Sequence, residues 1–325
     1  MSAVPNVTIG LSLRRAGRIL IASVVALVGV GIGAGHAPAS TAATPRPVFF
    51  GIYVPHQSLS AVPEVTAAAG TAPSVFSLFV TYDSGFTTST LTNVYASGAT
   101  PFVTFEPWSW TTGTSPNQPQ YSLSTIYSGR YDTQLRTLAR AIAAYQRGVY
   151  FRFAHEMNGW WMPWAESVNG NKPGDYVKAW RHVHDLFASV GATNARWVWS
   201  PAQVMSHVNE TPMAELYPGD GYVNYVGMSC YGHSGTAATT CGATLTGLSA
   251  ITTKHVILSE IGADGTNQAN WITSLAPFIS TNPNIIGFVW FNTTPETTGA
   301  TGHYMFTDTP ASVTAFRGML AALGI

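Results

Sequence analysis

Eight short apolar runs, separated by helices or by spacers of helix length, constrain the fold of this chain most strongly. The runs are apolar on both faces, as strands are when helices cover a parallel sheet. They cover residues 48–54, 74–80, 101–106, 149–153, 196–200, 225–231, 255–260 and 285–291. The segments that follow them predict helices at 59–69, 90–96, 130–147, 175–190, 270–279 and 309–323. This alternation predicts a single-domain α/β fold, a (β/α)₈ TIM barrel.

An open, doubly wound sheet is the alternative arrangement of alternating strands and helices. That fold commonly binds phosphate groups on a glycine-rich loop after its first strand, whereas Pro55, His56 and Gln57 follow the first run here. The chain also shows no short repeat and no linker to a second domain. We therefore expect one barrel over residues 44–325.

The N-terminal segment has the order of a secretory signal. Three arginines precede an apolar run from Ile19 to about Ala34, and small residues suited to cleavage follow at 37–39 and 41–43. We expect residues 1–43 to be a signal peptide, cleaved at about 39–43, and the mature domain to be secreted. An uncleaved membrane anchor is the alternative, because the apolar run approaches transmembrane length. After cleavage, no stable membrane association is expected.

The charge of the mature domain excludes one class of partner. Three of the 15 Lys and Arg residues lie in residues 1–43, which hold no acidic residue, so 12 basic residues remain against 15 acidic ones. The formal charge is then about −3, and no basic patch is visible, so nucleic acid is not an expected partner. Few charges and many Ser, Thr, Asn and aromatic residues fit a secreted monomer that acts on a neutral polymer.

The chain has two cysteines, Cys230 and Cys241. In an exported protein a disulfide is the expected state of such a pair, and it would close a short loop after the sixth run. A zinc site is not expected, because two cysteines without histidines at ligand spacing cannot supply four ligands.

Polar and aromatic residues collect at the C-terminal ends of the runs, where barrels of this kind carry their active sites. They are His56, Asp83, Glu106, Trp108, His155, Glu156, Ser200, Tyr231, Glu260 and Trp290. Two glutamates, Glu156 and Glu260, end the fourth and seventh runs on opposite sides of one mouth. Paired carboxyl groups hydrolyse glycosidic bonds, one as general acid and the other as nucleophile. Tryptophans, which follow the fourth run, stack on the C–H faces of sugar rings.

Other chemistries fit the motifs less well. His155-Glu-Met-Asn-Gly159 is not the His-Glu-x-x-His motif of zinc proteases, and no Gly-x-Ser-x-Gly elbow of a serine hydrolase is present. The reaction expected of two glutamates requires neither a metal nor a cofactor. Two alternatives of another class stay open: a barrel that binds carbohydrate without cleaving it, and a wall protein with a fortuitous motif.

These motifs resemble glycoside hydrolase family 26, a family of retaining (β/α)₈ enzymes whose acid/base glutamate follows a histidine. The resemblance rests mainly on Arg152-Phe-Ala-His-Glu-Met-Asn-Gly159, with Trp161 and Trp164 at family-like offsets. Weaker similarity is found in Tyr217–Gly227, in Ser259-Glu-Ile-Gly262 and at Trp290. The resemblance covers about residues 48–320 and implies a polysaccharide substrate.

The resemblance also implies a role for each site residue. Glu156 would be the general acid/base, kept protonated by burial, and Glu260 would be the nucleophile. Tyr231 would donate to Glu260, Arg152 would keep Glu260 charged, and His155 would bind the sugar or position a carboxylate. Trp290 would form the floor of the reacting subsite, and Trp161 would stack on the leaving-group sugar. The remaining expected substrate-binding residues are Glu106, as a ligand for a hydroxyl group, Trp108 and Trp164.

Four of these residues have a purely structural alternative. Arg152 would then neutralise an acid in the barrel interior without a role in the reaction. Trp161 or Trp290 would be a core residue, and Tyr231 would belong to the disulfide loop.

The resemblance favours β-1,4-mannan as substrate, cleaved internally in the manner of a mannan endo-1,4-β-mannosidase. Mixed-linkage β-glucan and β-1,3-xylan are the alternatives. Many mannan-cleaving members carry Trp-Phe-Trp-Trp after the acid/base glutamate, whereas this chain has Trp160-Trp-Met-Pro-Trp164, which looks closer to members that act on β-glucan.

Overall fold

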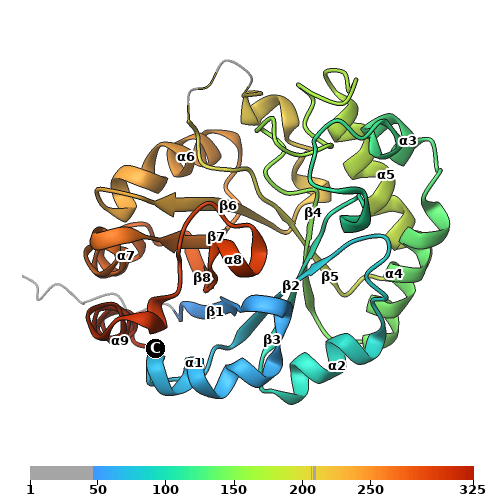
Figure 1. Ribbon diagram of the computed structural model, residues 1–325. Coiled ribbons are helices and arrows are strands. Elements are labelled where there is room, and N and C mark those ends of the chain that lie inside the picture. The colour runs from blue at the N-terminus through green and yellow to red at the C-terminus, as the bar shows by residue number, and fades with distance from the viewer. Residues whose placement is uncertain (1–46, 206, 208–209) are drawn as a thin grey trace, which may run out of the picture. The chain divides into compact units, whose positions relative to one another are not determined.

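The computed structural model describes residues 47–205, 207 and 210–325, and the predicted signal segment 1–43 lies outside them. Eight parallel strands close into a barrel in which β1 pairs with both β2 and β8 (Figure 1). The predicted (β/α)₈ barrel is confirmed, and each predicted run overlaps one strand. The strands are β1 (Phe49–Tyr53), β2 (Val75–Val80), β3 (Thr100–Phe105), β4 (Val149–Phe153), β5 (Ala195–Trp199), β6 (Tyr225–Gly232), β7 (Val256–Ala263) and β8 (Ile285–Phe291).

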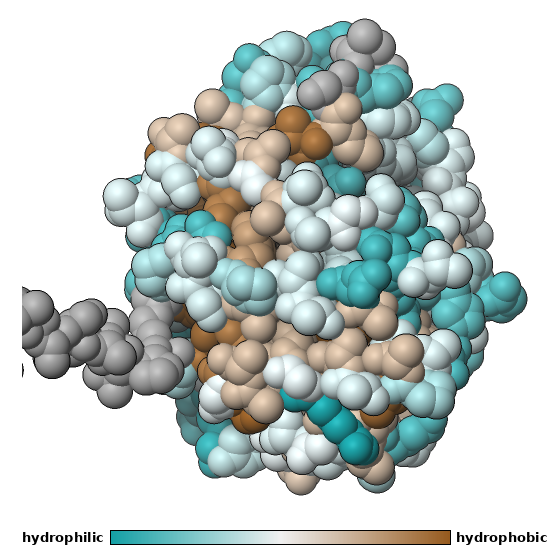
Figure 2. Space-filling view, turned by 90° about the vertical axis from the view of Figure 1, so that its left-hand side faces the viewer, coloured by the Kyte–Doolittle hydropathy of each residue, from teal (hydrophilic) through white to brown (hydrophobic). Residues whose placement is uncertain are grey.

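Helices surround the strands and cover their outer faces, apart from the short α8, which is drawn inside this ring (Figure 1). They are α1 (Val62–Ala69), α2 (Thr88–Ala96), α3 (Leu123–Tyr127), α4 (Asp132–Tyr145), α5 (Asp175–Ser189), α6 (Ala237–Ile251), α7 (Gln268–Thr281), α8 (Pro295–Thr298) and α9 (Pro310–Leu323). Within the part of the chain that the structure describes, no helix has the length and apolar character needed to cross a membrane. Over the side formed by α6, α7 and α9, apolar residues form small separate patches among polar ones (Figure 2).

Helix α6 occupies a segment for which the sequence predicts only a spacer. The segment contains no charged residue and is rich in Thr, Ala and Gly, so it has no clear polar and apolar faces. A capping box between Thr236 and Thr239 begins the helix, and Cys241, Leu245 and Leu248 are buried on its inner side. Capping and tertiary packing, rather than sequence periodicity, therefore produce this helix.

The predicted disulfide between Cys230 and Cys241 is confirmed, but it does not close a loop beside a strand. Cys230 lies in β6 and Cys241 lies inside α6, and both are fully buried. The bond therefore fixes the end of one barrel strand to the helix that covers it.

Apolar side chains fill the lower part of the barrel interior. They form a buried cluster separate from the larger core between strands and helices. Its members are Val75, Phe102, Val198, Ile257 and Val289. Polar interior residues lie toward the C-terminal ends of the strands, so the site must be sought at that end.

Candidate active site

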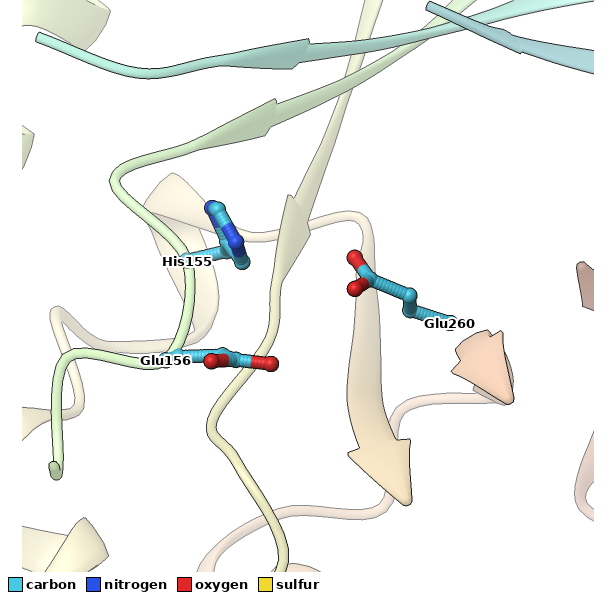
Figure 3. Close-up of side chains that lie close together, drawn as sticks. All are labelled: His155, Glu156 and Glu260. Atoms are coloured by element: carbon cyan, nitrogen blue, oxygen red, sulfur yellow. The ribbon is translucent and has the colours of Figure 1, made fainter. Parts of the chain in front are cut away.

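Two glutamates face one another across the barrel mouth (Figure 3). Glu260 lies within β7 and is 7% exposed, and Glu156 lies three residues after the end of β4. One carboxylate oxygen of each glutamate and a ring nitrogen of His155 lie within 4.8 Å of one another. Both glutamates can therefore contact the same bond of a molecule bound between them.

Two side chains hold the Glu260 carboxylate. Arg152 of β4 forms a buried ion pair with its Oε2, and the hydroxyl of Tyr231 of β6 donates to its Oε1. Arg152 is itself fixed, because it is fully buried and its Nε donates to Oγ1 of Thr104 at 2.9 Å. Burial and the charge of Glu260 raise the pKa of Tyr231 well above its ordinary value, so its hydroxyl remains a donor. Glu260 is thus an ion-paired carboxylate oriented through both oxygens.

Glu156 has a different environment. Burial, and then the negative charge of Glu260, raise the pKa of its carboxyl group above the ordinary value. The Nε1 of Trp161 donates to its Oε2 at 2.8 Å. Two neighbouring carboxyl groups in unequal environments can take the different protonation states of an acid and a nucleophile.

The backbone that carries Glu156 is strained. Ala154 and Glu156 have φ values of 45° and 56°, in a region that residues with a side chain rarely adopt. Backbone hydrogen bonds fix this turn: Ala154 N donates to Phe105 O at 2.9 Å, and Glu156 N donates to Ser200 O at 2.8 Å. Strain of about 1–3 kcal/mol per residue is typical of functional sites. The turn directs the Glu156 side chain toward Glu260 (Figure 3).

His155 lies beside the two glutamates and is 2% exposed. Burial, and then the charge of Arg152, lower the pKa of its imidazole well below the ordinary value, so the ring is neutral. Within the described residues its Nδ1 has no hydrogen-bond partner. A neutral imidazole both donates and accepts hydrogen bonds, which suits a sugar hydroxyl group.

The tryptophans expected at the mouth are of two kinds. Trp164 is fully buried, packs edge-on against Trp108 at 5.7 Å and donates to the backbone oxygen of His155 at 2.6 Å. It supports the loop and cannot offer a ring face to a substrate, which corrects its expected role. Trp161 is partly exposed. Trp110, which is outside the predicted set, is 47% exposed.

Glu106 is a third carboxyl group at the mouth, and it is 6% exposed. Its Oε2 accepts hydrogen bonds from Nε1 of Trp108 at 3.1 Å and from Nε1 of Trp110 at 2.7 Å. Burial raises its pKa to about 7. Both indoles donate to the same oxygen, and within the described residues no hydrogen bond to Oε1 is found, which is compatible with the predicted role of Glu106 as a ligand for a hydroxyl group.

Trp290 does not lie at the mouth, so the expectation that it forms the floor of a subsite is wrong. It is fully buried outside the barrel, packs edge-on against Phe316 at 5.4 Å and donates to the backbone oxygen of Tyr304 at 2.8 Å. Side chains alternate along a strand, and Val289 belongs to the inner cluster. Trp290, the next residue, therefore faces outward.

Phe291 takes the inward position at the end of β8. Its ring stacks on Tyr53 at 4.5 Å and meets Tyr231 edge-on at 6.1 Å and Phe79 at 5.9 Å. It is partly exposed, so it offers aromatic surface beside the tyrosine that contacts Glu260. Side chains alternate along β8, so the inward orientation of Val289 implies the same orientation for Phe291 two residues later. This alternation is the signal that could have identified Phe291 in the sequence.

The three remaining residues at strand ends form no side-chain hydrogen bond to Glu156 or Glu260 among those found in the described residues. Ser200 is buried and its Oγ lies 2.6 Å from Oγ of Ser259. Asp83 accepts hydrogen bonds from Thr81 and Ser109, which orders the loops after β2 and β3. His56 is exposed in the turn that follows β1.

One group of potential metal ligands exists among the described residues, formed by His155, Glu156 and Glu260. These are the residues that the expected reaction would use, and Glu260 is already ion-paired with Arg152. The buried guanidinium repels a cation at this position. The donor set therefore does not favour a resident metal ion.

Comparison with known proteins agrees with the geometry. The family model described as glycosyl hydrolase family 26 matches residues 86–275, more than half of the chain, and this range contains both glutamates. Endoglucanase H of Acetivibrio thermocellus is 30% identical over 245 residues, which cover 70% of this chain and 25% of that protein. Beta-1,3-xylanase TXYA of a Vibrio species is 32% identical over 112 residues, which cover 34% of this chain and 22% of that protein. The chain thus spans about a quarter of the length of these relatives.

The fold has solved counterparts. A beta-mannanase of family 26 from Bacteroides ovatus aligns with a TM-score of 0.64 and 19% identity, over 86% of this chain and 89% of that one. At this identity the alignment shows the shared barrel alone. Together, the family match and the barrel identify the chain as a member of glycoside hydrolase family 26.

Proposed function

We propose that this glycoside hydrolase is a secreted, endo-acting β-glycanase that cleaves polysaccharide with retention of anomeric configuration. The observation that carries the proposal is the pair Glu156 and Glu260, with carboxylate oxygens within 4.8 Å of each other. Retaining glycosidases place their carboxyl groups about 5–5.5 Å apart, whereas inverting ones need about 6.5–9.5 Å to hold a water molecule. The close approach of these oxygens is compatible with a retaining pair, and the resemblance to a family of retaining enzymes supports a double displacement.

In the first step, the ion-paired carboxylate of Glu260 attacks the anomeric carbon, and Glu156 gives its proton to the leaving glycosidic oxygen. A covalent glycosyl–enzyme ester forms and the sugar on the leaving side departs. In the second step, the carboxylate of Glu156 takes a proton from water, the water oxygen attacks the anomeric carbon, and Glu260 is released. The raised pKa of Glu156 supports its first role, and the two fixed donors on Glu260 support an oriented nucleophile.

The sequence resemblance favours β-1,4-mannan as the polymer. A second candidate is mixed-linkage β-glucan, which is favoured by the match to an endoglucanase and by the segment Trp160-Trp-Met-Pro-Trp164. The match to a β-1,3-xylanase adds β-1,3-xylan to the polymers that need to be tested.

The test is the release of reducing ends by the mature protein from galactomannan, mixed-linkage β-glucan and β-1,3-xylan in parallel. Glu156→Gln and Glu260→Gln are the controls, because glutamine keeps the shape of the side chain but cannot transfer the proton or attack. We expect one polymer to be cleaved, a loss of several orders of magnitude in both variants, and a first product with retained configuration by NMR. Polysaccharide binding without new reducing ends would instead support a barrel that binds carbohydrate only.

A further inference from the structure

The end of β6 that carries Tyr231 has a strand neighbour on one side only. On the side of β5, the ladder contains only Val198 and Trp199, and a single bridge follows at Ser229. On the other side, β7 pairs with β6 as far as Gly232. A segment with few ladder bonds opens locally at low cost. This end of β6 therefore needs further restraints if the Tyr231 hydroxyl is to stay on Glu260.

Two contacts replace the missing ladder. The backbone N–H of Tyr231 donates to Oε1 of Gln203 at 2.7 Å, from the segment that follows β5. On the face of the strand that α6 covers, the disulfide ties Cys230 to Cys241. Of these two restraints only the disulfide is covalent, and its sulfur atoms are buried with their residues.

Cys230 and Tyr231 are neighbours that project from opposite faces of the strand. Cys230 points to α6, and the ring of Tyr231 stacks on Tyr304 at 4.6 Å on the side of the mouth. The positions of the Cys230 sulfur and of the Tyr231 hydroxyl are thus both set by the same short segment of backbone. A shift of this backbone moves the hydroxyl relative to Glu260.

We propose that the Cys230–Cys241 disulfide positions the reacting carboxylate, by holding the end of β6 where the Tyr231 hydroxyl can donate to Glu260. This inference rests on the proposed role of Glu260 as nucleophile. Without the disulfide the donor is still present, but its backbone loses its only covalent restraint to α6 and is held less firmly. Misplacement by about 1 Å of a group that orients the reaction lowers rates by about 100-fold.

A double-mutant cycle tests the inference. The variants are Cys230→Ala with Cys241→Ala, then Tyr231→Phe, and then all three substitutions together. All are assayed well below the lowest melting temperature, on the polymer that the wild type cleaves. We expect loss of the disulfide to lower kcat by about 10- to 100-fold with little change in KM. In the Tyr231→Phe background, loss of the disulfide should cause no further decrease, because both changes remove the same interaction.

Leu245→Ala is the matched control. Leu245 is a buried residue of α6, one turn beyond Cys241, so this change destabilises the same helix and leaves the disulfide intact. It should lower the melting temperature without lowering kcat. Equal kcat losses in the control and in the cysteine variant, or independent effects of the disulfide and of Tyr231, would overturn the inference.

Hydrogen exchange provides a readout that does not depend on activity. The cysteine variant should lose protection at the amides of position 230, Tyr231 and Gly232 more than at the amides of β7. Unchanged protection at the end of β6 rules out the proposed positioning even if the wild type cleaves none of the polymers. Inactivity of the wild type itself counts against the proposed function instead.

Discussion

The indole N–H of Trp161 is one of the groups that adjust the acidity of Glu156. The hydrogen bond from Trp161 stabilises the carboxylate form and so lowers the pKa, against the larger effect of burial, which raises it. Trp161→Phe removes this bond, so the carboxyl group should keep its proton to higher pH. As the general acid acts in its protonated form, the basic limb of the kcat/KM profile should move upward in pH.

Trp160→Phe is the control for this prediction. Trp160 packs edge-on against Trp161 at 4.9 Å, so the change alters the same aromatic loop and keeps the hydrogen bond to Glu156. The basic limb of the kcat/KM pH profile of Trp160→Phe should lie at the same pH as in the wild type. A limb that stays in place or moves to lower pH in Trp161→Phe would contradict the assignment of Glu156 as the acid.

Glu106 should make stability depend on pH. Its pKa is raised from 4.5 to about 7 in the folded state, mainly by burial, so the folded state binds a proton more tightly than the unfolded state does. The stabilisation is complete at pH values below 4.5 and is lost as the pH rises through about 7. At about 1.4 kcal/mol per pKa unit, the change is on the order of 3 kcal/mol. Glu106→Gln should remove it.

The measurement is the free energy of unfolding in urea at pH 4.5 and pH 7.5, for the wild type and Glu106→Gln. Other groups titrate in this range, and they contribute equally to both proteins, so the difference between the two pH slopes reports on Glu106. Equal slopes would show that the Glu106 carboxyl group has an ordinary pKa.

Whether a residue at a strand end belongs to the site could be predicted where a charge or a motif marks it. It could not be predicted where membership depends only on whether the side chain points into or out of the barrel. Arg152, Glu156, Tyr231 and Glu260 meet because each lies in or just after the C-terminal half of a strand in one closed barrel. The prediction for Trp290 is wrong because the motif gives the residue type but does not say which residues of β8 point into the barrel. Trp110 was missed because its exposure depends on the path of a loop.

At the scale of elements, the contact between β6 and α7 has no spare room. A Cβ atom at Gly232 would overlap the indole ring of Trp271 in α7, whose position is also fixed by a hydrogen bond to Thr240. Gly232→Ala should therefore force the strand and the helix apart and destabilise the protein by about 1–3 kcal/mol. It should also lower kcat, because Tyr231 precedes this residue.

Gly242→Ala in α6 is the matched change. No atom lies within 4 Å of a Cβ built there, and alanine is favoured over glycine inside a helix by about 1 kcal/mol. This variant should be as stable as the wild type or more stable, with unchanged kcat. Thermal and urea unfolding of the two variants check the pair, and a stable Gly232→Ala protein would show that the helix adjusts freely.

Helix α6 marks the limit of prediction at this scale. The amphipathic pattern of the sequence predicts α4, in which Leu135, Leu138 and Ile142 share the buried face. In α6 the exposed face carries Thr, Ser, Gly and Ala, which give no contrast with the buried face. Its existence follows only from the barrel, because β7 must be reached from β6 by a crossover that covers the sheet.

At the scale of the whole molecule, the residues that pack the barrel interior and the paired glutamates lie at opposite ends of the barrel. The apolar cluster that includes Ile257 fills the interior below, and the glutamates lie at the C-terminal ends of the strands. This division could be predicted from the fold class alone, since barrel enzymes carry their sites at one face. The strand registers, which decide whether each side chain points into or out of the barrel, could not be predicted. They depend on local shifts in strand pairing, such as the one between Met228 and Ser229 in the pairing of β6 with β7.

Ile257→Ala tests this separation. The side chain is fully buried among apolar residues, so its truncation leaves a cavity and should lower the free energy of unfolding by about 2–5 kcal/mol. Glu260 follows three residues later on the same strand, but it is held from the side by Arg152 and Tyr231 rather than from below. The kcat of the folded variant and both limbs of its pH profile should therefore match the wild type, measured below its melting temperature. A shifted limb or a kcat lowered more than a few-fold would mean that packing at the base sets the geometry of the carboxylates, and the two ends of the barrel would then form one functional unit.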